Sequence, residues 1–188
     1  GDDQRFDYIY KYVSADNWES MRARGMSPLD EGHLYVARFD DDNTGEWLEL
    51  TIDNPVLADR FDSQEEVLTY ARVAADLLEA TPMDRPEWIS VAPDDYVYCT
   101  LTNNSRRTVA DAANPLAPNP DGHIIRWTET GGHTGTTFEW DIFLLAGPQG
   151  DSQVLPEEGG PPLNEDNIFA SPDGVWFDCN GILWVQTD

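Results

Sequence analysis

Two carboxylates, Glu87 and Asp173, stand at matching points of two similar stretches of the sequence. Each directly precedes the core of an alternating apolar segment, and in the alignment of the two stretches Ile89 matches Val175. Carboxylates that converge in little space take up protons, pair with cations or bind a metal ion. Glu87 and Asp173 are therefore candidate metal ligands. The alternative is that both are exposed turn acids, because "SPDG" is a common turn sequence.

An arginine interrupts the apolar pattern of a second repeat. "GHLYVARFDDDNTGEWLEL" begins at Gly32 and "GHIIRWTETGGHTGTTFEWDI" begins at Gly122, and in the second copy Arg126 replaces Val36. The planar guanidinium suits a phosphate or carboxylate ligand, which it can hold with two prongs. Glu129, three residues on, could bind a metal ion or pair with Arg126. The alternative for Arg126 is a structural ion pair between neighbouring units.

Paired amides close the strand segment "YVYCTLT". Asn103 and Asn104 of "LTNN" offer oxygens to a cation or N–H groups to an anion, which makes them candidate binding residues. Paired asparagines at the end of a strand also simply form turns.

The histidines indicate no nucleophilic catalytic set. His33 and His123 occupy the same position of the repeat, after a glycine, which favours a structural role, and His133 lies in a glycine-rich turn. The sequence contains no recognisable Ser–His–Asp or Cys–His pattern, phosphate-binding glycine loop or HExxH motif. A metal-dependent or oxyanion-stabilising mechanism fits this inventory better.

The elements that must position these residues are mostly short strands separated by Gly, Asn, Asp and Pro turns. The expected strands cover residues 6–13, 33–39, 46–52, 87–92, 96–102, 123–129, 138–146, 175–178 and 182–188.

One helix is expected among the strands, at residues 63–80. Ser63 and Glu66 form a capping box at its start, and the helix must end before Pro82. Its buried stripe comprises Val67, Ala71, Ala74 and Leu78.

The repeated order of strand pair, loop and strand pair predicts an all-β fold built from four-stranded antiparallel propeller blades. Blade parts are expected at 1–60, a helical insertion at 62–80, a complete blade at 87–146 and the start of another at 172–188. Because a propeller needs about four or more blades to close, the sequence is expected to be part of a longer protein, with apolar blade faces exposed. The alternative is a compact β domain that echoes itself.

The charge excludes some partners. With 36 acidic and 11 basic residues, the net charge is −25, and Lys11 is the sole lysine. Such a surface repels nucleic acid and anionic membranes, and no apolar run reaches the roughly 18–20 residues that span a bilayer. A halophilic, solvating surface explains most of the acids, which lie in loops such as "FDDDNTGE" and "LPEEGG". Carboxylates held for hard cations such as Ca²⁺ are the second explanation.

The two cysteines lack the Cys-x-x-Cys spacing of a metal site. Cys99 and Cys179 are expected to be buried thiols, with a disulfide between them as the alternative.

The ordered set "TPMDRPEW", "TLTNN", "GHIIRW", "FEWDIFLLAG" and "SPDGVWFD" resembles the PhoX-type bacterial alkaline phosphatases over essentially the whole chain. This resemblance implies a six-bladed propeller and a secreted or periplasmic phosphomonoesterase, exported by the twin-arginine route. It also implies a site of oxygen-bridged Ca²⁺ and Fe³⁺ ions, small phosphomonoesters as substrates, and no insertion into a membrane.

The resemblance also suggests roles for individual residues. Glu87 and Asp173 match positions that ligate metal, and Arg126 and Glu129 match a phosphate-contacting and an acidic position. Three further residues match more loosely, as substrate-binding positions: Arg85, Asn103 and Asn104.

The sequence departs from the family pattern in one region. Nothing here matches the "TCEE"-like segment that supplies a cysteine to the family's iron site, and we expect no export signal within these residues. We therefore expect this chain to hold part of the metal shell. Two other functions stay open, a Ca²⁺-dependent propeller lactonase or esterase and a non-catalytic binding propeller.

Overall fold

One curved antiparallel sheet makes up most of the chain in the computed structural model, which describes residues 3–148, 153–154 and 163–188. The strands follow the spatial order β2-β3-β4-β9-β8-β7-β6, and β10 pairs with β9. Their bounds are β2 (Tyr10–Ser14), β3 (Gly32–Phe39), β4 (Thr44–Glu49), β6 (Pro86–Val91), β7 (Val97–Leu101), β8 (His123–Glu129), β9 (Thr137–Leu145) and β10 (Gln153–Val154).

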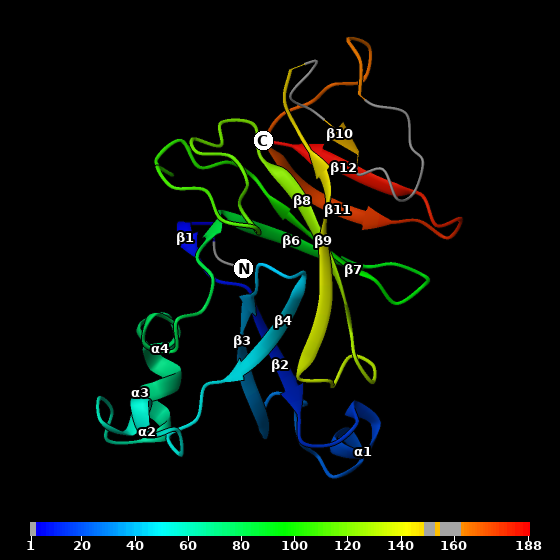
Figure 1. Ribbon diagram of the computed structural model, residues 1–188. Coiled ribbons are helices and arrows are strands. Elements are labelled where there is room, and N and C mark those ends of the chain that lie inside the picture. Colours follow the sequence, from blue (N-terminus) through cyan, green and yellow to red (C-terminus); the bar gives the residue numbers. More distant parts are fainter. Residues whose placement is uncertain (1–2, 149–152, 155–162) are drawn as a thin grey trace.

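Two smaller sheets flank this one (Figure 1). The chain enters through β1 (Arg5–Asp7), which pairs with β5 (Met83–Asp84). Near the other end, β11 (Pro172–Phe177) and β12 (Leu183–Thr187) form a hairpin that packs against β6 and β7. Both sequence repeats are therefore antiparallel hairpins, and the expectation of a mostly β fold is confirmed.

The four strands at 87–146 form a continuous antiparallel meander from β6 to β9. The sheet does not stop there, because β9 also pairs with β4. Gly45 allows this close approach, since a Cβ atom at that position would lie 2.2 Å from the ring of Phe138.

The expected helix at 63–80 is two short helices instead of one. The chain bends at Tyr70, whose ring stacks on Phe61, so a tertiary contact overrides a continuous helical pattern. Ser63 does cap the first helix, accepting a hydrogen bond from the backbone N–H of Glu66. The helices are α1 (Trp18–Ala23), α2 (Pro55–Ala58), α3 (Gln64–Thr69) and α4 (Ala71–Leu77). In the described part of the chain, none has the length and hydrophobicity that a bilayer crossing requires.

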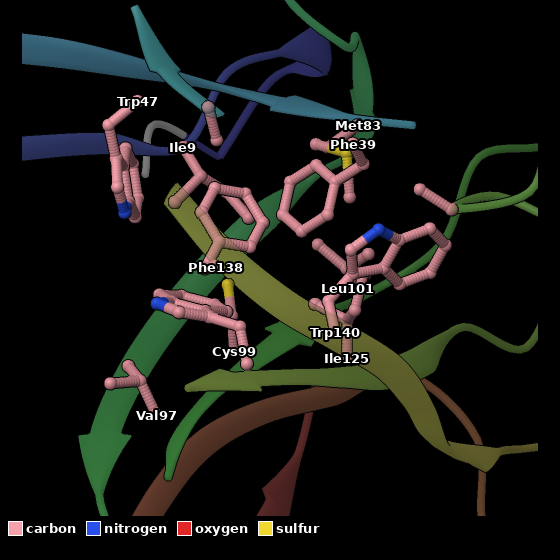
Figure 2. Close-up of a cluster of buried hydrophobic side chains, with 13 residues drawn as sticks. Ile9, Phe39, Trp47, Met83, Val97, Cys99, Leu101, Ile125, Phe138 and Trp140 are labelled. Atoms are coloured by element: carbon pink, nitrogen blue, oxygen red, sulfur yellow. The ribbon is translucent and has the colours of Figure 1, made fainter. Parts of the chain in front are cut away.

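The hydrophobic core has three parts, which lie against different regions of the sheet. An aromatic cluster fills the inside of the curve and includes Phe39, Trp47, Trp127 and Phe138, most of which Figure 2 labels. A second cluster lies under α2–α4, and a third lies between the main sheet and the β11–β12 hairpin.

The two cysteines are both free thiols, so they do not form a disulfide. Cys99 is fully buried, as expected, whereas Cys179 is exposed in the turn between β11 and β12. The "LPEEGG" loop lies outside the described residues.

Candidate functional site

The segment that joins β5 to β6 sends consecutive side chains in different directions. Asp84 ends β5 with a fully buried side chain, and Pro86 begins β6. Between them, Arg85 has a left-handed backbone with φ of 56°, and its carbonyl accepts a hydrogen bond from the N–H of Thr102 at 3.1 Å. The guanidinium of Arg85 therefore points in a different direction from the Asp84 carboxylate.

Three acids, Asp3, Glu87 and Asp173, interact with one another, and we call them the carboxylate cluster. The Arg85 side chain contacts this cluster. The Arg85 guanidinium donates to Asp3, and it also lies 3.5 Å from an oxygen of Asp188. The hydrogen bond from Arg85 lowers the pKa of Asp3. Burial, a hydrogen bond with Asp3 and the charges of Asp3 and Asp173 raise the pKa of Glu87 to about 7. The neighbouring acids thus make the ionised form of Glu87 less favourable than that of an isolated glutamate.

Asp173 approaches Glu87 because β11 packs across β6 and β7. The hydroxyl of Thr100 in β7 donates to the backbone carbonyl of Asp173 at 2.6 Å. Two residues earlier, Ser171 accepts a 3.2 Å hydrogen bond from the Asn103 side-chain amide. The structure thus brings four of the candidate residues to one end of these strands: Arg85, Glu87, Asn103 and Asp173.

Asn104 does not belong to this group. It is fully buried, and its side-chain amide donates to the Asp84 carboxylate at 2.8 Å. Arg107 and Asn119 donate to the same carboxylate, at 2.6 and 2.9 Å. Sequence reasoning missed Asp84, although its position between two prolines was unusual. Its partners lie 20 to 35 residues further along the chain, and no local pattern connects them to it.

Arg126 lies elsewhere, between the main sheet and the β11–β12 hairpin. Its Nε and Nη2 donate to the two carboxylate oxygens of Asp141 at 2.8 and 2.9 Å, directly across the β8–β9 pair. The guanidinium also lies over the rings of Tyr96 and Phe143, 4.8 and 5.5 Å from their centroids. With 5% of its surface exposed, Arg126 makes the contacts of a structural ion pair.

Glu129 lies on the opposite face of β8, as its spacing of three residues from Arg126 requires. Its carboxylate accepts from the indole N–H of Trp127 at 3.2 Å, and lies 3.7 Å from the Lys11 ammonium. His133 is 3.2 Å away. Glu129 therefore forms an ion pair with Lys11 and not with Arg126.

The donor atoms suit a hard cation, but they are not a complete shell. Carboxylate oxygens are the ligands that Ca²⁺ prefers, and a cation would relieve the mutual repulsion of Glu87 and Asp173. Among the described residues, no set of three or more His, Cys, Asp or Glu side chains is arranged to hold an ion. A thiolate from Cys99 is disfavoured, because burial raises the pKa of its thiol to about 12.

A mostly β chain that gathers carboxylates and a guanidinium at the start of neighbouring strands is equipped to handle cations and anionic groups. The family model described as "Alkaline phosphatase PhoX" matches residues 1–188. The chain belongs to the PhoX alkaline phosphatase family.

A solved structure supports the same assignment. The chain resembles Pseudomonas fluorescens PhoX, solved in complex with vanadate, a transition-state analogue, with 41% sequence identity and a TM-score of 0.85. The similarity covers 100% of this chain and 35% of that one, so the chain spans about a third of the length of its solved relative. A search of curated proteins found no match to the chain.

Proposed function

We propose that the protein hydrolyses phosphomonoesters and that residues 1–188 supply part of its catalytic centre. The observation that carries this proposal is the meeting of Glu87 and Asp173 beside the Arg85 guanidinium, from strands far apart in the sequence. The family membership and the vanadate bound by the P. fluorescens relative support it, because vanadate imitates the charge and geometry of a phosphoryl group in transfer.

In this proposal Glu87 and Asp173 hold metal ions of the kind that the family resemblance implies, Ca²⁺ and Fe³⁺. When bound, the ions supply positive charge that stabilises the phosphoryl oxygens in the transition state. Arg85 presents N–H groups in a planar fork that matches two phosphoryl oxygens, and exchanges Asp3 or Asp188 for the substrate. Asn103 adds an amide at the edge of the same group.

The catalytic roles of Arg126 and Glu129 stay predictions. For Arg126 to bind substrate, its guanidinium must give up the two-pronged contact with Asp141. For Glu129, the contact with Lys11 must change in the same way. Asn104, bound to Asp84, acts on the site from a distance in this proposal and does not touch the substrate.

We further propose that the sheets are blades of a six-bladed propeller. The β6–β9 meander has the form of a blade, and the exposed faces of β6, β11 and β12 carry Trp88, Trp176 and Trp184, which are 54%, 67% and 60% exposed. Further strands packed on this apolar face would bury it. A periplasmic or secreted location, a halophilic surface and small phosphomonoesters as substrates complete the proposal.

The test is phosphate release from p-nitrophenyl phosphate by the protein at its natural length, with elemental analysis of the bound metals. Glu87→Gln and Asp173→Asn should each lower kcat/KM by at least about 100-fold and reduce the metal content. Glu139→Gln is the matched control, because Glu139 is exposed on β9 away from the cluster. Full activity of Glu87→Gln, or faster turnover of a carboxylic ester or lactone than of the phosphomonoester, would contradict the proposal.

A further inference from the structure

The polar network around Asp84 is satisfied in one arrangement of protons. The Nε2 atom of His123 lies 2.9 Å from the carbonyl of Ala113, so Nε2 carries the hydrogen and Nδ1 accepts. The Asn119 amide, 3.0 Å from that Nδ1 and 2.9 Å from Asp84, then uses both of its hydrogens. Its oxygen accepts from the N–H of Gly122 at 2.9 Å. In this arrangement the Asp84 carboxylate accepts from Asn104, Arg107 and Asn119, and the Nδ1 atom of His123 carries no hydrogen.

The network joins segments that are distant in the sequence. The backbones of Asn104 and Asn119 bond to each other in both directions, at 2.6 and 3.2 Å, and close the base of the connection between β7 and β8. Arg107, within that connection, also donates to the carbonyl of Pro82 at 2.6 Å. The whole connection is therefore fixed to the chain on both sides of Met83, immediately before the candidate site.

The backbone at Arg85 needs such support. A left-handed conformation is unfavourable for a residue with a Cβ atom, and a residue before proline prefers extended conformations. A conformation of this kind persists where surrounding contacts hold it. Here the contacts are the bonds to Asp84 on one side and the hydrogen bond from Thr102 on the other.

We propose that Asp84 is a positioning residue, whose buried bonds to Arg107, Asn104 and Asn119 hold the turn at Arg85 and so aim Arg85 and Glu87 at Asp173. This inference rests on the proposed role of Glu87 and Asp173 in holding a cation. Because Asp84 is fully buried, its role in this proposal is to position other residues and not to contact substrate or metal. A role of this kind resembles the outer-shell partners of metal ligands, whose loss typically weakens metal binding by 10- to 100-fold.

Terbium(III), which occupies Ca²⁺-type oxygen sites, provides a test that does not depend on turnover. Trp88 directly follows Glu87 in β6, and it lines one pocket with Trp176 and with Gly174, the residue after Asp173. Tryptophan excitation should therefore sensitise the emission of terbium bound there. The signal that disappears in Glu87→Gln defines this site. In Asp84→Asn, the terbium concentration that half-saturates it should rise at least about tenfold.

The control must lose a side-chain hydrogen bond of the core without touching the network. Tyr8→Phe does so, because the hydroxyl of the buried Tyr8 donates a partly buried hydrogen bond to Asp76 of α4. Its melting temperature should fall while its terbium binding stays within twofold of the wild type. If Asp84→Asn does not fold, Asn119→Ala takes its place, since it leaves the ion pair of Asp84 with Arg107 intact.

Two results would overturn the positioning role: terbium binding within twofold of the wild type in the Asp84 or Asn119 variant, or an equal weakening in Tyr8→Phe. If Glu87→Gln does not change the terbium signal, the proposed cation site is wrong, and crystal structures of the variants decide about positioning. Loss of the left-handed conformation at Arg85 supports it, and an unchanged Arg85 with Glu87 still beside Asp173 refutes it.

Discussion

Replacing Arg126 distinguishes a catalytic role from a structural one. In Arg126→Ala the two charge-assisted bonds to Asp141 are lost, together with the packing against Tyr96 and Phe143. Breaking a buried ion pair by removing one partner costs about 3–5 kcal/mol. The Asp141 side chain is 25% exposed, and water can solvate it in part, so we expect a loss of about 2–3 kcal/mol in the free energy of unfolding.

Urea unfolding and thermal melting measure this change. For a chain of this size, the expected loss corresponds to a fall in Tm of roughly 5–10 °C. The double variant Arg126→Met, Asp141→Leu should recover most of the stability, because an apolar pair leaves no uncompensated charge in the site. Asp141→Leu alone provides the remaining corner of the double-mutant cycle, whose coupling energy should be about 1–3 kcal/mol.

Stability and turnover together decide the role. A double variant with wild-type stability and full hydrolysis of p-nitrophenyl phosphate would show that the predicted catalytic role of Arg126 is wrong. The same stability with activity lost by more than about 1,000-fold would support that role. A change below about 0.5 kcal/mol in Arg126→Ala would refute the structural reasoning, since that is the range of ordinary surface substitutions.

Three further predictions concern the core and the thiols. Burial lowers the pKa of His123 below 6.5 despite the nearby Asp84 and Asp111, with Arg107 acting in the same direction as burial. As the pH falls, the unfolded chain therefore takes up this proton before the folded chain does. Below pH 6.5 the free energy of unfolding should fall by up to about 1.4 kcal/mol per pH unit. Urea titrations between pH 7.5 and 5.5 should show a weaker dependence of this free energy on pH in His123→Gln than in the wild type. Gly122→Ala should cost about 1–3 kcal/mol by the same assay, because φ is 83° and a Cβ would lie 2.2 Å from a backbone oxygen; an unchanged midpoint would contradict this. A maleimide should label the exposed cysteine at once and the buried one after unfolding, and mass spectrometry showing two rapid additions would count against the packing of β7.

The sequence predicted local features better than long-range partners. The strands of each hairpin follow from the alternation of apolar and polar residues, and the helix cap at Ser63 follows from its spacing to Glu66. The break at Tyr70 could not be predicted, because it depends on stacking against Phe61. The pairing of Arg126 with Asp141 was equally inaccessible, since the irregular register between Ile124 and Ile125 decides which β9 residue faces Arg126.

The proximity of Glu87 and Asp173 is the part of the candidate site that the sequence could predict. Both residues occupy the same position in similar hairpins, and two such hairpins that pack face to face bring equivalent positions together. The packing of β11 on β6 and β7, fixed by the hydrogen bond from Thr100 to Asp173, provides this contact. The second hairpin lacks the Asp84 network, since Ala170 stands where the first hairpin has Asp84, and Ser171 stands where it has Arg85. Ser171 shares the left-handed backbone, with φ of 54°, so the two hairpins repeat the turn before the acid while holding it by different contacts.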